Sequence, residues 1–131
     1  MNAGEPGPEL NQLTEKIIGC AYTVSNELGC GFVERVYENA LAYELRQSGL
    51  GVVQQHPIKV HYHGVVVGDY TADMVVEETV LVELKAASSL SNVHTAQCMN
   101  YLRATGIPIC LLMNFGRPKV QIQRIAGRRG A

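Results

Sequence analysis

The chain has 131 residues, the length of one ordinary domain, which is enough to bury a hydrophobic core. Its composition, 47% hydrophobic and 18% charged, excludes an intrinsically disordered chain, and no apolar run reaches the roughly 18 residues that a membrane span needs. The net charge of −1 gives no overall signal of nucleic-acid binding.

The N-terminal residues 1–9 have neither the basic region nor the apolar region of a signal peptide. We therefore predict a short disordered lead, a cytoplasmic protein, one domain over residues 10–126 and a basic tail over residues 127–131. Every acidic residue lies at or before Glu83, so the basic C-terminal third could contact phosphates while the acidic part holds cations. For Arg128 and Arg129 a solvated tail is an equally good interpretation.

Two amphipathic helices are predicted in the first 50 residues. Apolar residues recur at steps of three and four from Leu10 to Leu28, and Gly29 is a natural end to that helix. A second helix covers about 33–48. Its apolar stripe is expected to consist of Val36, Ala40, Leu41 and Leu45. Glu34, Tyr37 and Glu38 share one patch of its first turns, where Glu34 could simply complement the helix dipole.

Residues 52–67 are predicted to be extended, with a turn at His63-Gly64. Surface or cross-strand positions are the favoured interpretation for the three histidines of this segment over a zinc site. The cysteines are widely and irregularly spaced, which favours reduced thiols, mostly in the core, over a metal or redox role. They are Cys20, Cys30, Cys98 and Cys110.

Residues 70–85 read as a hairpin, with two apolar, β-branched runs around an acidic turn. If residues 77–79 form a three-residue loop, Val76 pairs with Val80, and Asp73 lies across from Glu83. Alternation along the strands then places Glu83 and Lys85 on one face together with Leu81, and Asp73 joins that face from the partner strand. The other face is expected to carry Ala72, Met74, Val76, Val80, Val82 and Leu84.

These charged side chains lie on a hairpin that is otherwise hydrophobic. A buried charge costs several kcal/mol unless it is paired or binds a metal. The run Val80-Leu81-Val82 is typical of a central strand covered on both sides, which favours a functional cluster. The alternative is an ion pair between Asp73 and Lys85 on a solvated face.

A third helix is predicted over about 93–104, with Ser91 or Asn92 as its N-cap. His94, Gln97 and Tyr101 would form one polar and aromatic face on it. Residues 105–108 break the helix, residues 109–113 form an apolar central strand, and residues 120–125 form a final, more exposed strand. This order of elements predicts a mixed α/β sheet with helices packed on it.

Three motifs carry a resemblance to a known family. Asp73 followed by Glu83-Leu84-Lys85 resembles the signature of the PD-(D/E)xK nuclease superfamily, although Ala72 replaces the usual proline. The run from Gln97 to Tyr101 looks like the Gln-x-x-x-Tyr motif of its RecB-like branch. Gly31-Phe32-Val33-Glu34-Arg35-Val36-Tyr37 matches the pattern that names the prokaryotic GxxExxY proteins. The similarity extends roughly from Leu10 to Ile125.

The resemblance implies a restriction-endonuclease-like core, a mixed central β-sheet flanked by helices, and metal-dependent phosphodiester hydrolysis. Asp73, Glu83 and the carbonyl of Leu84 would hold Mg²⁺, with Mn²⁺ as a substitute, and Glu34 would approach the same ion. Lys85 would orient or deprotonate the attacking water. Gln97 and Tyr101 would brace the site or meet the substrate strand.

Two hypotheses follow. The first is a Mg²⁺-dependent nuclease that acts on DNA, with RNA less favoured, and that has little sequence preference. The second is a non-catalytic binding module or self-assembling scaffold on the nuclease fold. A small domain with a long apolar hairpin is also compatible with a homo-oligomer.

Overall fold

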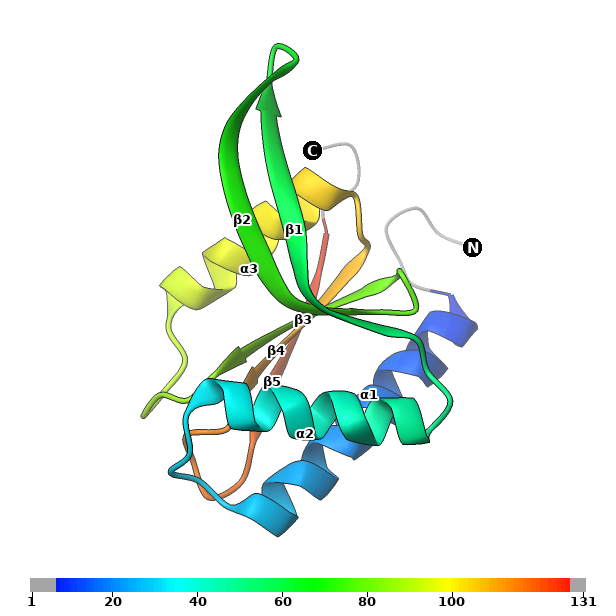
Figure 1. The fold of residues 1–131 in the computed structure, drawn as a ribbon, viewed down its shortest axis with the longest axis vertical. Helices are drawn as coiled ribbons and strands as arrows, with labels where there is room; N and C mark the ends of the chain where they lie inside the picture. The colour runs from blue at the N-terminus through cyan, green and yellow to red at the C-terminus, as the bar shows by residue number, and fades with distance from the viewer. Residues whose placement is uncertain (1–6, 128–131) are drawn as a thin grey trace.

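The computed structural model describes residues 7–127, in which a five-stranded sheet separates two helices from a third (Figure 1). The strand order is β1-β2-β3-β4-β5. Neighbouring strands are antiparallel except β3 and β4, which are parallel. The elements are α1 (Pro8–Leu28), α2 (Glu34–Gln47), β1 (Val52–Tyr62), β2 (Val65–Val76), β3 (Val80–Lys85), α3 (Asn92–Thr105), β4 (Ile109–Asn114) and β5 (Gln121–Ala126). The predicted mixed α/β class is therefore confirmed.

The ends of the chain differ slightly from the predicted boundaries. Pro8 and Glu9, expected in the disordered lead, form the first turn of α1, where the fixed φ of proline suits a helix start. Gly7 of that lead is the N-cap of α1, whereas residues 1–6, and Arg128 and Arg129 of the basic tail, lie outside the described residues. None of the helices within residues 7–127 combines the length and hydropathy needed to span a bilayer.

Tyr37 joins the two N-terminal helices to the sheet. Its side chain is fully buried, and its hydroxyl donates to the Gly29 carbonyl at 2.7 Å and accepts from the Phe32 N–H at 3.2 Å. Its ring stacks on Phe115, with centroids 4.8 Å apart. The expected stripe of α2 is corrected here, because Tyr37 occupies the core while Val36 is 36% exposed. Two hydrogen bonds satisfy the buried hydroxyl, so the larger ring can take the inner position.

Strands β1 and β2 form a long arm that projects beyond the rest of the sheet (Figure 1). The predicted turn is present, since His63 and Gly64 both have positive φ, as a two-residue hairpin turn requires. Strand β2 then continues without a break through Gly68 and Asp69, where the prediction had separated two segments. The arm carries exposed apolar side chains near its tip.

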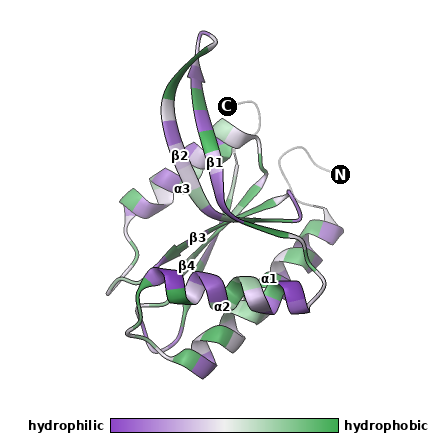
Figure 2. Ribbon diagram, in the orientation of Figure 1, coloured by the Kyte–Doolittle hydropathy of each residue, from purple (hydrophilic) through white to green (hydrophobic). Residues whose placement is uncertain are grey.

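The sheet has a core on each face. Strands β3 and β4 are buried on both faces, as predicted for central strands, and Figure 2 shows their hydrophobic character. Val80, Val82 and Leu84 pack in the core beneath α1 and α2, and Leu81 packs beneath α3. Cys98, on α3, and Cys110, on β4 beneath it, are buried, whereas Cys20 is half-buried and Cys30 is exposed, and none of the four forms a disulfide.

Ala72 lies on the opposite side of the sheet from the expected one. It belongs to the core beneath α3, whereas Met74 belongs to the core beneath α1 and α2. The β1–β2 pairing lapses between these residues, and Gln55, at the same level on β1, has a φ of +54°. A left-handed residue turns the strand pair locally, so the simple alternation of faces does not hold across Asp73.

Candidate active site

Asp73 and Glu83 face each other at the point where β2 leaves the sheet. The ladder between β2 and β3 pairs Val76 with Val80 and Met74 with Val82, which is the register predicted from the three-residue loop. Beyond the Met74–Val82 pair, hydrogen bonds between backbone N–H groups and side-chain carboxylates replace the backbone–backbone bonds between the two strands. The Asp73 N–H donates to Glu83 Oε1 at 3.0 Å, and the Leu84 N–H donates to Asp73 Oδ2 at 2.7 Å. The two carboxylates therefore lie side by side, as the register requires.

Burial makes this pair of acids unusual. Glu83 is only 4% exposed. Burial and the neighbouring Asp73 charge raise the pKa of Glu83 to about 8. Burial also raises the pKa of Asp73, and the negative charges of Glu38 and Glu34 add to that effect. Two adjacent carboxyl groups with raised pKa values favour a shared proton or a bound cation over two free charges.

The remaining oxygens are available for a cation. Within residues 7–127, Asp73 Oδ1 and Glu83 Oε2 have no hydrogen-bond partner, because the bonds to the backbone use the other oxygen of each group. Mg²⁺ prefers oxygen ligands, is commonly held by one or two carboxylates and keeps several waters. The carboxylates present therefore fit a divalent cation.

Lys85 points toward α3 and does not pair with the acids. Its Nζ donates to Gln97 Oε1 at 3.5 Å, and Gln97 Nε2 donates to the Tyr101 hydroxyl at 3.1 Å. In the described part of the chain, Lys85 forms no salt bridge within 4.0 Å, so the alternative of an Asp73–Lys85 ion pair is not what the structure contains. The structure thus connects Lys85, Gln97 and Tyr101 through hydrogen bonds between β3 and α3.

Glu34, which the resemblance placed near the same ion, does not join Asp73 and Glu83 in the structure. Its side chain is exposed in the first turn of α2. No three His, Cys, Asp or Glu side chains among residues 7–127 come close enough together to hold a metal ion. A first-turn glutamate complements the helix dipole while it stays in water, which is the alternative that the sequence left open.

Glu38, one turn further along α2, is the buried glutamate of this helix. It accepts hydrogen bonds from Gln54 Nε2 at 2.7 Å and Gln55 Nε2 at 2.8 Å, and Arg35 Nε lies 3.5 Å from it. These bonds tie α2 to β1 at the level of Asp73. Sequence reasoning missed this role, although adjacent glutamines inside a β-branched run were a usable signal.

His94 has a different role from the one its helical spacing suggested. Its Nδ1 accepts the N–H of Ser91, the residue that caps α3, at 3.2 Å. This contact stabilises the start of the helix, in the manner of a capping box. Of the predicted polar face of α3, Gln97 bonds Lys85 directly, and Tyr101 is connected to Lys85 through Gln97.

Comparisons with known proteins give a consistent result. A family model described as the PD-(D/E)XK nuclease superfamily matches residues 11–125. The search of curated proteins found no match. Among solved structures, LHK-Exo in complex with dAMP is similar to this chain, with 17% identity over 72% of this chain and 55% of that one and a TM-score of 0.55. LHK-Exo is described elsewhere as an alkaline exonuclease from Laribacter hongkongensis.

A second solved structure has a similar fold. SSO0001 has 15% identity and a TM-score of 0.53, over 71% of this chain and 49% of that one. The chain spans about half of the length of both structures. At these identities the likeness shows the fold alone.

Proposed function

Since the chain belongs to the PD-(D/E)XK nuclease superfamily, we propose that it is a divalent-metal-dependent nuclease with its active site at Asp73, Glu83 and Lys85. The observation that carries the proposal is that buried Glu83 and half-buried Asp73 face each other at the splayed end of β2 and β3. The Gly31–Tyr37 and Gln97–Tyr101 motifs support a finer assignment to the GxxExxY family and the RecB-like branch.

The chain's own residues divide the work of hydrolysis. Asp73, Glu83 and the main-chain carbonyl of Leu84 would hold Mg²⁺, or Mn²⁺ in its place. When bound, the ion would polarise the phosphoryl oxygen and lower the pKa of a bound water. Lys85, next along β3, would orient the attacking water and stabilise the charge that develops on the phosphate.

Gln97 and Tyr101 support the lysine. Gln97 is hydrogen-bonded to both Lys85 and Tyr101, so it restricts where the ammonium group can go. The proposed effect is to hold the Lys85 ammonium group in position. A charge that is already in place has to move less as the reaction proceeds. Glu34 has an indirect role in this proposal, because its negative charge helps to raise the pKa of Asp73.

DNA is the preferred substrate in this proposal. One structural neighbour was crystallised with dAMP, a deoxynucleotide, and this supports DNA over RNA.

The test is cleavage of labelled DNA by matched variants in Mg²⁺ and in Mn²⁺. Asp73→Ala and Lys85→Ala should each lower the rate by about 100-fold or more while circular dichroism stays unchanged. Glu78→Ala and Lys16→Ala remove the same charges at exposed positions away from the site and should cleave as the wild type does. Full activity of both site variants would overturn the assignment of the active site.

The second candidate function is a self-assembling scaffold on the nuclease fold. Its supporting observation is the exposed apolar surface of the arm, where Tyr62, Val65 and Val67 are each more than 60% exposed. Exposed apolar patches often mark contacts between copies. A wild-type protein that forms a stable oligomer and cleaves neither DNA nor RNA with either metal would favour the scaffold over the enzyme.

A further inference from the structure

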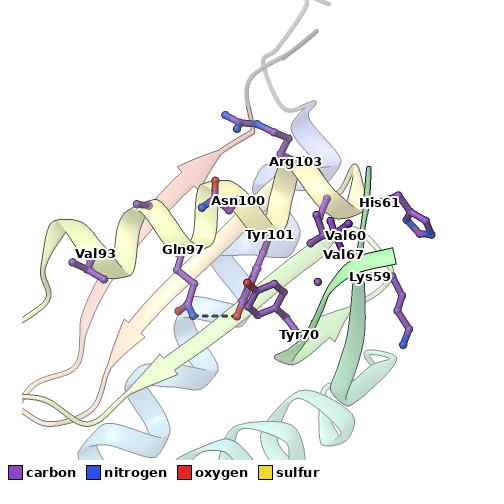
Figure 3. Close-up of a pocket in the computed structure, with 13 residues that line it drawn as sticks. Lys59, Val60, His61, Val67, Tyr70, Val93, Gln97, Asn100, Tyr101 and Arg103 are labelled. Atoms are coloured by element: carbon purple, nitrogen blue, oxygen red, sulfur yellow. Dashed lines mark hydrogen bonds between the residues drawn. The ribbon is translucent and has the colours of Figure 1, made fainter. Parts of the chain in front are cut away.

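A groove runs between the arm and helix α3, next to the candidate active site (Figure 3). Its volume is about 880 Å³. One wall comes from residues 59–70 of β1 and β2 and the other from residues 93–104 of α3. Gln97 and Tyr101 belong to its lining, so the groove ends at the hydrogen bonds that reach Lys85.

The lining of the groove has an unbalanced charge. It contains Lys59, His61 and Arg103 and no carboxylate, although the whole chain carries a net charge of −1. Lys59 is partly neutralised, because its Nζ lies 2.8 Å from Asp69 Oδ2. Arg103 forms no ion pair or side-chain hydrogen bond among residues 7–127. An arginine free at the rim of a groove is suited to a phosphate.

Two aromatic rings lie beside these cations. The Tyr70 and Tyr101 rings are 5.7 Å apart between centroids and tilted by 49°. Tyr101 is 7% exposed and supports the Tyr70 ring from the side of α3. Tyr70 is 50% exposed and keeps part of its ring open to the groove. Exposed aromatic rings combined with a positively charged groove are the elements with which proteins bind single-stranded nucleic acid.

The size of the groove and its exposed ring suit a single strand. A volume of about 880 Å³ lies in the range of pockets that enclose one small ligand, about 300 to 1,000 Å³. A few unstacked nucleotides fit such a space. In a duplex the bases are paired and stacked on one another, so no base face inside it is open to stack on Tyr70.

From these observations, and resting on the proposed nuclease function, we propose that the groove binds a single-stranded segment of the nucleic-acid substrate and leads it to Lys85. A base stacks on Tyr70, and Arg103 contacts a backbone phosphate. The substrate class of the enzyme is therefore single-stranded DNA or a frayed end, with the intact duplex excluded from the groove.

The test measures binding without cleavage. Fluorescence anisotropy of a labelled single-stranded oligonucleotide, and of a duplex of the same length, is recorded in EDTA. Tyr70→Ala should weaken binding of the single strand by roughly tenfold, which is the usual effect of losing one stacked base. Tyr43→Ala removes another tyrosine that is more than half exposed, on α2, and is the matched control; it should bind as the wild type does.

Salt dependence tests the phosphate contact. Arg103→Gln should weaken binding and lower the slope of log affinity against log salt by roughly 0.7, the value for one phosphate of a single strand. Lys16→Gln removes one charge from α1, on the opposite face of the sheet, and should leave the slope unchanged.

The outcomes separate this inference from the nuclease proposal. Wild-type binding by both Tyr70→Ala and Arg103→Gln would overturn the groove, as would equal losses for the single strand and the duplex, even if the wild type cleaves DNA. Weakened single-strand binding in both variants would support the groove even if no metal produced cleavage, and only the nuclease proposal would then fail.

Discussion

Replacing Glu83 by glutamine should stabilise the metal-free protein at alkaline pH, although it removes a proposed metal ligand. Burial, together with the charge of Asp73, raises the pKa of Glu83 from 4.5 to about 8. The folded protein therefore binds this proton more tightly than the unfolded chain does. The resulting stabilisation is complete below pH 4.5 and is lost as the pH rises to about 8.

The magnitude follows from the two pKa values. Each tenfold difference in proton affinity corresponds to about 1.4 kcal/mol, so ionised Glu83 lowers the free energy of unfolding by at most about 5 kcal/mol. Glutamine stays neutral, and its oxygen can still accept the Asp73 N–H that Glu83 accepts now. We expect Glu83→Gln to exceed the wild type by about 2 to 5 kcal/mol at about pH 9 and to match it at the acid end of the range.

The assay is equilibrium unfolding in urea, in EDTA, at several pH values. Glu78→Gln, in the exposed turn of the same hairpin, is the control and should follow the wild type at every pH. Adding Mg²⁺ at about pH 9 should stabilise the wild type and leave Glu83→Gln unchanged, because an ion that binds only the folded state shifts the equilibrium. Parallel pH profiles for Glu83→Gln and the wild type would refute the reasoning.

Two further predictions concern the supports of the site. Gly116→Ala should lower the free energy of unfolding by about 2 kcal/mol or more in urea, because a Cβ would overlap the backbone of Ala87, just after Lys85. Its control, Gly19→Ala in helix α1, meets no atom within 4 Å and should stabilise the protein by about 0.5 to 1 kcal/mol; equal effects of the two changes would contradict this. Tyr37→Phe should lower the free energy of unfolding by about 1 to 3 kcal/mol in the same assay, because it leaves the Gly29 carbonyl and the Phe32 N–H without their partner. An unchanged free energy would show that water replaces the hydroxyl.

The elements and the central hairpin could be predicted because their signals are local. Apolar residues three and four apart define α1 and α2, and a three-residue loop between β-branched runs sets the register that brings Asp73 across from Glu83. Two of the three motifs that carry the family resemblance lie on this hairpin and on the adjoining α3, and the third lies at the start of α2. Each motif is confined to one hairpin or to one helix with the residues that precede it.

Other expectations failed where a residue's role depends on which partner its side chain meets, whether that partner is near or far along the chain. Helical spacing grouped His94 with Gln97, but the cap of α3 uses His94. A shared patch joined Glu34 to Glu38, but only Glu38 meets the glutamines of β1. Strand alternation assigned Ala72 to the wrong face, because the left-handed Gln55 on the neighbouring strand interrupts the pairing.

The amino-acid sequence by itself determined the order of the elements, the register of the hairpin and the identity of the acidic pair. Periodicity and loop length act between near neighbours, so they can be read before the chain folds. Only the tertiary structure decided that Glu83 is buried enough to hold its proton to about pH 8, and that the arm and α3 enclose a groove between Tyr70 and Arg103. Burial and enclosure depend on packing between segments far apart in the chain, which local patterns do not specify.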